Sequence, residues 1–301
     1  MQVLTKIAFI VPRIKLIYKI FLLSAVIFSP FPVFSRTLTG PQRLRARVEF
    51  LTDSLCAGRS TGTSGSFEAA SYILRCFESC GMSVDCQTFD VDSLVGHNII
   101  GRHIGRPSAP MDYVLVIASY DGMGTVGGRI LPGADANASG VAALLEIAGR
   151  LKDSPHNYVF VALDAHNRSL AGAKACMSMF RKPGIVVNLD TMGSILAPVT
   201  PARTDDLIAL GGIPHARELE AENIFGDLVL YYDYYGSGSF TDLFYRRISD
   251  HKFWLENGVD CLMFTSGITE NTNKWYDDAV SLDYDIFSKR VDLISRWLAK
   301  Q

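Results

Sequence analysis

The sequence is poor in charge and in several features that mark particular protein classes. Only 20% of its 301 residues are charged, and the formal net charge is −2. Nucleic-acid-binding proteins usually carry a basic surface, so this balance argues against a nucleic-acid partner. No two of the six cysteines form a Cys-x-x-Cys pair, which excludes a zinc ribbon. With 48% apolar residues the chain is too apolar to be disordered, and its length allows one large domain or two small ones.

The sequence does not determine whether the cysteines form disulfides or remain free thiols. Six cysteines allow 15 pairings, and the sequence does not choose among them. Two of them lie four residues apart on a predicted helix, and a third is near enough in sequence to pair with either. Buried free thiols are equally compatible with the pattern. The six are Cys56, Cys76, Cys80, Cys86, Cys176 and Cys261.

Residues 1–35 have the features of a secretory signal peptide. They carry four cations and no acid, then the apolar run 20–28 and the small-residue pattern 33–35. The apolar run is much shorter than the roughly 20 residues that a membrane-spanning helix needs. We therefore expect an exported protein, periplasmic or secreted, with no stable membrane span after signal removal. The remaining residues, 36–301, are predicted to form a single domain with a net charge of −6.

Strand-like and helix-like segments alternate along this domain. Continuous apolar runs predict buried strands at 113–118, 158–163, 185–189 and 261–265. Helical spacing predicts helices at 67–80, 138–151, 169–180, 242–257 and 283–300. The alternation predicts an α/β fold, a three-layer α/β/α domain whose central mixed, mostly parallel sheet is flanked by helices.

Polar residues follow the predicted strands at the edge where α/β proteins bind ligands. Ser119 and Asp121 come after one strand, residues 164–167 after another, and Asp190 after a third. Asp135 lies in a Gly-rich loop that opens a helix, where it could present its carboxylate to a metal or simply cap the helix. Asp190 poses the same choice between a metal ligand and a former of the local turn.

Three further segments carry weaker signals. The glycines of 122–127 fit a dinucleotide fingerprint, but residues 129–133 follow where the required helix should begin. Ser249, Asp250 and His251 have the residue types of a catalytic triad, which is however a spatial arrangement, so we expect them to line a pocket or begin a helix. The aromatic stretch 230–235 predicts either a pocket wall or loop, or a partly exposed strand.

The order of several motifs resembles that of a known family. The segments are AGRSTGT at 57–63, GHNIIG at 96–101, PGADANASGVAALLE at 132–146, NLD at 188–190 with Gly193, and SDHKF at 249–253. From about residue 47 to residue 296 the chain resembles the zinc-dependent aminopeptidase and glutaminyl cyclase superfamily, metallopeptidase family M28. The resemblance implies a zinc-exopeptidase-like α/β/α fold and a peptide hydrolase that releases N-terminal residues.

The resemblance also assigns roles to positions of the site. The family typically holds two zinc ions through two His, two Asp and one Glu, and a further Glu serves as general base. Two ligand positions keep a ligand type, the bridging carboxylate at Asp135 and the second carboxylate at Asp190. The other positions are substituted: Ser119 replaces the first His, Asn167 the ligand Glu, His166 the general base, and Lys274 or Trp275 the late His.

These substitutions change the function that is expected. Two carboxylates without an imidazole do not suit a two-zinc centre, so we expect zinc to be absent or a single divalent metal to bind weakly. A mononuclear site would need His166 to join Asp135 and Asp190 as a ligand, and it could then not act as base. We predict an inactive or strongly altered aminopeptidase. The alternatives are a pseudopeptidase that binds a peptide or protein N-terminus, and a glutaminyl cyclase-like protein. The pocket residues are predicted to be Asp121, Asp250 and His251.

Overall fold

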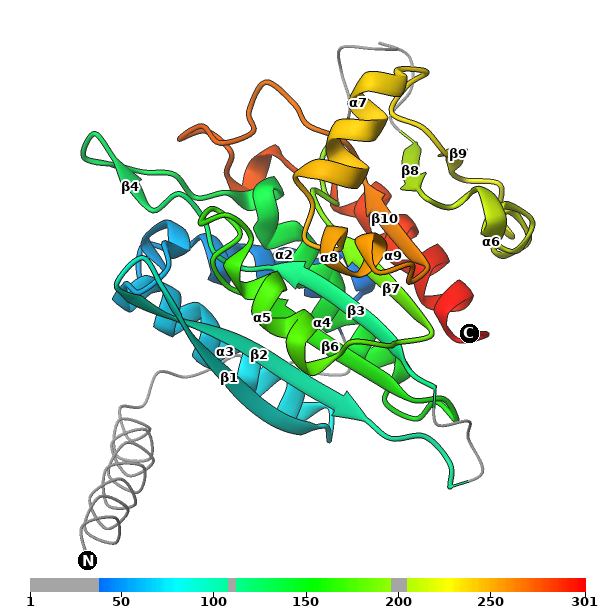
Figure 1. Cartoon of the computed structure of the whole chain (residues 1–301). Coiled ribbons are helices and arrows are strands. Elements are labelled where there is room, and N and C mark those ends of the chain that lie inside the picture. Colours follow the sequence, from blue (N-terminus) through cyan, green and yellow to red (C-terminus); the bar gives the residue numbers. More distant parts are fainter. Residues whose placement is uncertain (1–37, 108–111, 196–204) are drawn as a thin grey trace, which may run out of the picture. The chain divides into compact units, whose positions relative to one another are not determined.

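The computed structural model describes residues 38–107, 112–195 and 205–301 (Figure 1). Apart from Leu38, they belong to one compact unit, Thr39–Gln301. The predicted signal peptide, 1–35, lies outside the described residues. Within the part of the chain that is described, no helix has both the length and the apolar character needed to cross a bilayer.

A mixed sheet of eight strands forms the centre of this unit. The strand order is β1-β2-β6-β3-β7-β10-β8-β9, and four of its seven pairings are parallel. The four neighbouring strands β6, β3, β7 and β10 all run in the same direction, so their carboxyl ends meet at one edge. The strands are β1 Ser83–Val91, β2 Leu94–His103, β3 Val114–Ser119, β6 Tyr158–Leu163, β7 Ile185–Leu189, β8 Asp206–Leu210, β9 Val229–Tyr231 and β10 Cys261–Thr265.

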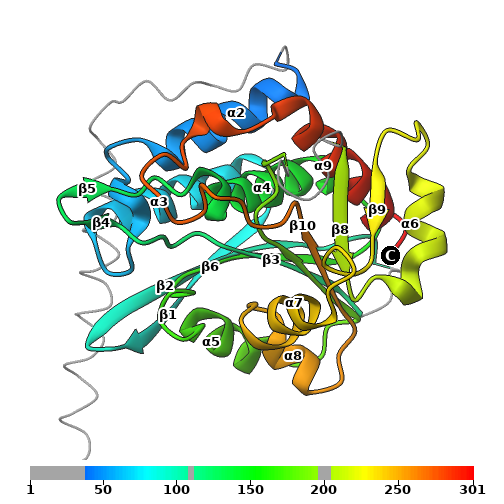
Figure 2. The same ribbon diagram turned by 90° about the horizontal axis from the view of Figure 1, so that it is seen from above.

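Helices cover both faces of the sheet (Figure 2). One face carries α2 Gly40–Thr52, α3 Ser64–Ser79, α4 Gly140–Leu151 and α9 Tyr284–Leu298. The other carries α5 Ala171–Met179, α7 Gly238–Asp242 and α8 Lys252–Glu256, and α6 Ala216–Glu222 lies beside β9 at the sheet edge. Short elements complete the unit: η2 Ala57–Arg59, β4 Thr125–Val126, β5 Arg129–Ile130, η3 Ala134–Ser139, η4 Ile213–His215, η5 Leu243–Arg247 and η6 Ala279–Ser281. This is the predicted three-layer architecture.

The apolar pattern explains how the layers form. Val116 of β3 belongs to the core beneath α2, α3, α4 and α9, whereas its neighbours Leu115 and Ile117 belong to the core beneath α5 and α8. Successive strand residues point to opposite faces, so a strand covered on both faces must be apolar throughout. Helix α4 is buried along ten of its twelve residues because α2, α3 and α9 all contact it. Its one buried acid, Glu146, is neutralised by Arg43 and Arg150.

Several predicted boundaries differ from the structure. The helix expected over 242–257 is interrupted, since η5 ends at Arg247 and α8 begins at Lys252. The interruption places Asp250 and His251 in a buried turn. Only residues 230–231 of the aromatic stretch 230–235 belong to a strand, β9, and the rest turns away. The edge strands β1 and β9 were not predicted because β1 is rich in polar residues and β9 has only three residues. The inner strand β8 is fully buried and was missed, because its apolar run of four residues is short.

All six cysteines lie in the described residues and are free thiols. Cys56, Cys176 and Cys261 are buried, whereas Cys86 is exposed on the outer strand β1. Burial raises the pKa of Cys56 to about 11, so this thiol is protonated near neutral pH. The structure therefore contains no disulfide among its described residues.

Candidate functional site

The carboxyl ends of β6, β3, β7 and β10 form the edge at which the candidate site lies. We call the residues whose side chains follow these strands the rim: Ser119, His166, Asn167 and Asp190. Behind them lie four buried polar residues that hold the connecting loops in place. We call these the frame: Arg59, Asn137, Asp164 and Asp277, each at most 5% exposed.

Arg59 holds together the loops that lead to the site. Its side chain is fully buried, and it donates to four backbone carbonyl oxygens, those of Tyr120 at 2.8 Å, Leu51 at 2.5 Å, Pro132 at 2.7 Å and Gly133 at 2.9 Å. The Gly133 carbonyl oxygen also accepts the Ala138 backbone N–H at 3.1 Å, whereas the other three carbonyl oxygens depend on Arg59, and leaving them without a donor would cost stability. The 57–63 motif therefore has a structural role, because its arginine fixes the loops after β3 and before η3.

Asp164 fixes the turn that carries His166 and Asn167. Its carboxylate accepts hydrogen bonds from the Thr61 hydroxyl at 2.8 Å, the His97 backbone N–H at 3.0 Å and the Ala165 backbone N–H at 2.7 Å. Its own backbone N–H donates to Asn98 Oδ1 at 3.0 Å. The turn is thus attached to η2 and to strand β2 before it reaches the rim.

Asn137 links the Gly-rich loop to two strand ends. Its Nδ2 donates to the carbonyl oxygens of Ser119 at 3.2 Å and Leu189 at 3.1 Å. Its Oδ1 accepts from the backbone N–H groups of Gly140 at 3.1 Å and Thr191 at 3.0 Å. One amide side chain therefore sets the position of the loop relative to β3, β7 and the start of α4.

Asp135 points into the protein and is already hydrogen bonded at both carboxylate oxygens. Oδ1 accepts from the Gly193 backbone N–H at 2.9 Å and from the Ser139 hydroxyl at 3.2 Å, and Oδ2 accepts from the Ser194 hydroxyl. Burial nevertheless raises the pKa of this carboxyl group. Asp277 in turn accepts the backbone N–H of Asp135 at 2.8 Å and that of Ala136 at 3.2 Å. The contacts of Asp135 are therefore those of a residue that shapes the loop.

The Asp121 carboxylate accepts hydrogen bonds from two rim residues, His166 and Asn167. Its Oδ1 accepts the His166 backbone N–H at 2.8 Å, and its Oδ2 accepts the Asn167 backbone N–H at 3.1 Å and side-chain amide at 3.2 Å. Burial raises the pKa of Asp121 to about 6 despite these donors. The amide of Asn167 is thereby directed towards Asp121, while the residue itself is exposed.

His166 forms an ion pair with Asp250. Its Nδ1 lies 2.9 Å from Asp250 Oδ2, the carboxylate is 3% exposed and the imidazole 30% exposed. Burial alone lowers the pKa of His166, but the carboxylates of Asp250, Asp190 and Asp121 outweigh it and raise the pKa to about 10. The ring is therefore an imidazolium near neutral pH, with both nitrogens protonated.

Asp190 is the rim carboxylate most accessible from outside. It follows β7, is partly exposed, and has a pKa raised to about 6 chiefly by burial, with Asp250 and Asp135 contributing. The His166 imidazolium opposes this rise. Ser119, at the end of β3, is buried and lies next to the Asn137 amide, with Oγ at 3.4 Å.

The remaining predicted residues lie apart from this group. His251 is fully buried, accepts from Asn188 Nδ2 at 3.3 Å and lies against the Tyr245 ring, and burial lowers its pKa to about 4. It is a neutral core histidine. Lys274 and Trp275 lie on an exposed loop. The Arg129 guanidinium packs over the Trp275 ring in a cation–π contact, 5.5 Å from the ring centroid.

Three frame residues were not predicted as functional from the sequence. Arg59 lies in the motif at 57–63 and Asn137 in the motif at 132–146. Membership of these motifs is the feature of the sequence that could have pointed to them. Asp277 lies in an irregular loop with no periodicity, and nothing near it in sequence indicates that it contacts a loop 142 residues away.

The family model for Peptidase family M28 matches residues 98–297, which is most of the described unit. The chain belongs to this family. The prediction of family and of fold class made from the motifs is thereby confirmed, and the matched residues include the whole rim and every frame residue except Arg59.

Known proteins similar to this M28 chain include two kinds of enzyme. BSAP, a zinc aminopeptidase from Bacillus subtilis, superposes with a TM-score of 0.71 at 14% identity, covering 88% of this chain and 96% of that chain. A glutaminyl cyclase from Porphyromonas gingivalis superposes with a TM-score of 0.67 at 17% identity, covering 87% and 98%. At these identities the likeness establishes the fold alone.

A sequence relative is the "Alkaline phosphatase isozyme conversion protein" of Escherichia coli (strain K12). It is 28% identical over 161 residues, which are 45% of this chain and 47% of that protein. The "Uncharacterized protein YfbL" of the same organism is 32% identical over 111 residues, 36% and 33% of the two chains. The matched segments thus span less than half the length of these relatives.

Membership of family M28 implies zinc, and the residues present do not fit a two-zinc centre. Both oxygens of Asp135 already accept hydrogen bonds, His166 uses Nδ1 for Asp250, and Ser119 and Asn167 are weak ligands. Among residues 38–107, 112–195 and 205–301, no three His, Cys, Asp or Glu side chains are grouped so that they could hold a metal. Asp190 remains as the one rim carboxylate.

Proposed function

We propose that the protein is an exported, catalytically silent member of Peptidase family M28 that binds peptides through their free N-terminus. The observation that carries the proposal is the ion pair between His166 and Asp250. It favours the protonated form of the imidazole at the position where the family resemblance assigns a general base.

A general base must have a free lone pair at the working pH. With a pKa of about 10, the His166 imidazolium has none at neutral pH. The Asp135 carboxylate is occupied by internal donors and Asn167 offers an amide in place of a carboxylate, so Asp190 alone is too few ligands for a metal that would activate water instead. The same substitutions count against glutaminyl cyclisation and against a mononuclear site built from Asp135, His166 and Asp190.

The charge of the rim favours a cationic ligand group. The carboxylates of Asp121, Asp190 and Asp250 surround a single imidazolium, so the group carries net negative charge near neutral pH. Asp190 is the partly exposed member and is open to an incoming donor. An α-ammonium group would form a charge-assisted hydrogen bond with it. The predicted signal peptide, 1–35, supports an exported location in which such peptides are met.

Catalytic silence is tested by metal analysis together with an aminopeptidase assay. The mature protein, purified after export, is incubated with excess Zn²⁺, passed through gel filtration and analysed for bound metal, and is then assayed with leucine 4-nitroanilide. BSAP treated in parallel is the positive control. We expect substoichiometric zinc and no turnover. Stoichiometric zinc with turnover that Asp190→Asn abolishes would refute the proposal.

N-terminus binding is tested separately by calorimetry with a matched pair of peptides. The probes are the tripeptide Ala-Ala-Ala and its N-acetylated form. We expect saturable binding of the free peptide, at least about tenfold weaker binding of the acetylated one, and a similar loss in Asp190→Asn. Equal binding of both peptides, or no binding of either, would overturn this part of the proposal.

A further inference from the structure

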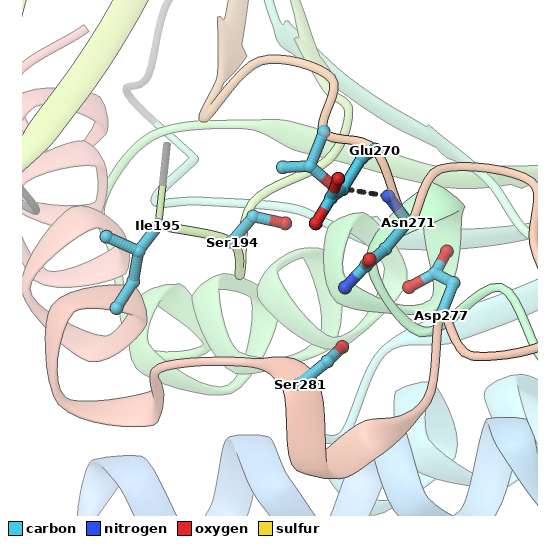
Figure 3. A pocket seen from close by; sticks show the side chains of 7 residues that line it. Ser194, Ile195, Glu270, Asn271, Asp277 and Ser281 are labelled. Atoms are coloured by element: carbon cyan, nitrogen blue, oxygen red, sulfur yellow. Dashed lines mark hydrogen bonds between the residues drawn. The ribbon is translucent and has the colours of Figure 1, made fainter. Parts of the chain in front are cut away.

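A pocket separate from the rim lies between the loops that follow β7 and β10 (Figure 3). Its volume is about 380 Å³, within the usual range for sites that take small ligands. None of the four rim residues lines it. Its lining residues are Ser194, Ile195, Thr269, Glu270, Asn271, Asp277 and Ser281.

The two serine hydroxyl groups of this pocket offer acceptors to a ligand. The Ser194 hydroxyl donates its proton to the Asp135 carboxylate. The Ser281 hydroxyl donates its proton to the carbonyl oxygen of Asp278 at 2.7 Å. In both cases the proton is used within the protein, so the oxygen offers only lone pairs to a ligand. Figure 3 shows both hydroxyls turned towards the pocket.

Two carboxylates add negative charge to these acceptors. Asp277 is fully buried, and the backbone N–H groups of Asp135 and Ala136 hold its carboxylate in place. Figure 3 shows this carboxylate facing the pocket. Glu270 is exposed at the same pocket. Among the described residues, the seven that line the pocket include two acids and no base, so their formal charge is −2.

We propose that this pocket binds an organic cation with several N–H donors, an ammonium or guanidinium group on a short apolar stem. Such a group supplies the donors that the serine and carboxylate oxygens lack and balances their charge. Ile195 provides an apolar contact for the methylene groups of the stem. The Arg59 guanidinium acts on the Asp277 carboxylate from within the protein, but the two carboxylates of the pocket still favour a cation over a neutral or anionic ligand of the same size.

The proposal does not depend on peptide binding at the rim. The cation has two sources of the same chemistry, a free amine or the basic side chain of a peptide. Calorimetry with cadaverine and agmatine tests the first, and N-acetyl-lysine amide and N-acetyl-arginine amide test the second. Their blocked N-termini prevent binding through an α-ammonium, so failure here and failure at the rim are distinguishable. 1,5-Pentanediol is the neutral control.

Two variants and one matched control locate the binding. Glu270→Gln changes an exposed side chain and is expected to weaken binding several-fold, while Asp277→Asn is expected to weaken it at least about tenfold. Glu256→Gln, an exposed acid at the end of α8 on the other face of the sheet, is expected to leave the affinity unchanged. Circular dichroism checks that Asp277→Asn is folded, and Glu270→Gln keeps the test valid if it is not.

The expected result is saturable binding of at least one cation, weakened by salt and by Glu270→Gln, with no binding of the diol. Binding of the free amines only, or of the blocked amino acids as well, identifies the source. Absence of saturable binding by all four cations up to about 10 mM would overturn the proposal. Binding that equals that of the diol, or that is unchanged in Glu270→Gln and in folded Asp277→Asn, would overturn it too.

Discussion

The frame and the rim differ in how completely their polar groups are satisfied. Arg59 of the frame donates to four carbonyl oxygens, and Asn137 uses both ends of its amide between two strands and a helix. On the rim, Asp190 is partly exposed and has a raised pKa, and His166 depends on a single ion pair. The polar groups of the frame are thus used within the protein, whereas those of Asp190 and His166 on the rim are partly accessible to a ligand.

This difference separates the residues that hold the loops of this M28 domain from those at the positions to which the resemblance assigns chemistry. The bonds of Arg59, Asn137 and Asp164 lie between backbone segments and need no metal. Substitutions on the rim, such as Ser119 and Asn167 at ligand positions, leave these bonds intact. A fold can therefore persist while the ligand set changes, because stability and chemistry depend on separate residues.

The largest effect is expected where the frame is broken at Arg59. Arg59→Met leaves three carbonyl groups, those of Leu51, Tyr120 and Pro132, without a donor, so we expect the free energy of unfolding to fall by about 3–5 kcal/mol. Chemical denaturation measures this change. The matched control is Arg45→Met, whose partner Glu49 lies in an exposed ion pair and which should cost about 0.5 kcal/mol or less. Similar losses in both variants would show that Arg59 is not a frame residue.

A smaller loss is expected at Asn137. Asn137→Ala removes the link from the Gly-rich loop to β3 and β7, and should lower the free energy of unfolding by about 2 kcal/mol. Asn257→Ala is the control, since its exposed amide makes one hydrogen bond, to the Phe253 carbonyl oxygen. An Asn137→Ala protein as stable as this control would contradict the distinction between frame and surface.

The ion pair of the rim residue His166 should make the stability of the folded protein depend on pH in the alkaline range. The pKa of His166 is raised from 6.5 to about 10 on folding, so its stabilising effect is complete below pH 6.5 and is lost as the pH rises towards 10. Asp190 and Asp121, raised to about 6, also make the folded state less stable between pH 4 and 6 as the pH rises. His251, lowered to about 4, acts in the opposite direction below pH 6.5.

Thermal unfolding between pH 7 and 10 tests the part due to His166. We expect the wild-type protein to lose on the order of 1–2 kcal/mol more than His166→Gln over this range, after allowance for the exposed part of the ring. The difference between the two profiles removes the contribution of other groups that titrate near pH 10. Parallel profiles would show that the ion pair with Asp250 contributes nothing.

The smallest effect on stability is expected at Asp190. Since burial raises the pKa of this carboxyl group, the charged form is disfavoured by the fold, and Asp190→Asn should leave the free energy of unfolding unchanged or higher near neutral pH. Chemical denaturation checks this value, with Asp164→Asn as the destabilised comparison. A loss at Asp190 as large as that at Asp164 would place Asp190 in the frame.

Much of the fold followed from local patterns. The buried strands at 158–163 and 185–189 were predicted with the observed bounds because strands covered on both faces must be apolar throughout. The helix expected over 242–257 was wrong in its middle, where the chain turns to bury Asp250 and His251. That turn is stabilised by contacts with distant segments, which periodicity does not record.

For the candidate site, too, some properties follow from the residue types alone and others depend on tertiary contacts. The sequence by itself determined which residue types stand at the M28 ligand positions, and so that Ser119 and Asn167 are weak ligands, because this is a property of the side chain alone. Only the tertiary structure decided that Asp135 is saturated by Gly193 and Ser194 and that His166 is held as a cation by Asp250, 84 residues further along the chain. Hydrogen-bond partners and pKa values depend on which groups the fold brings within a few ångströms, and no local pattern contains that information.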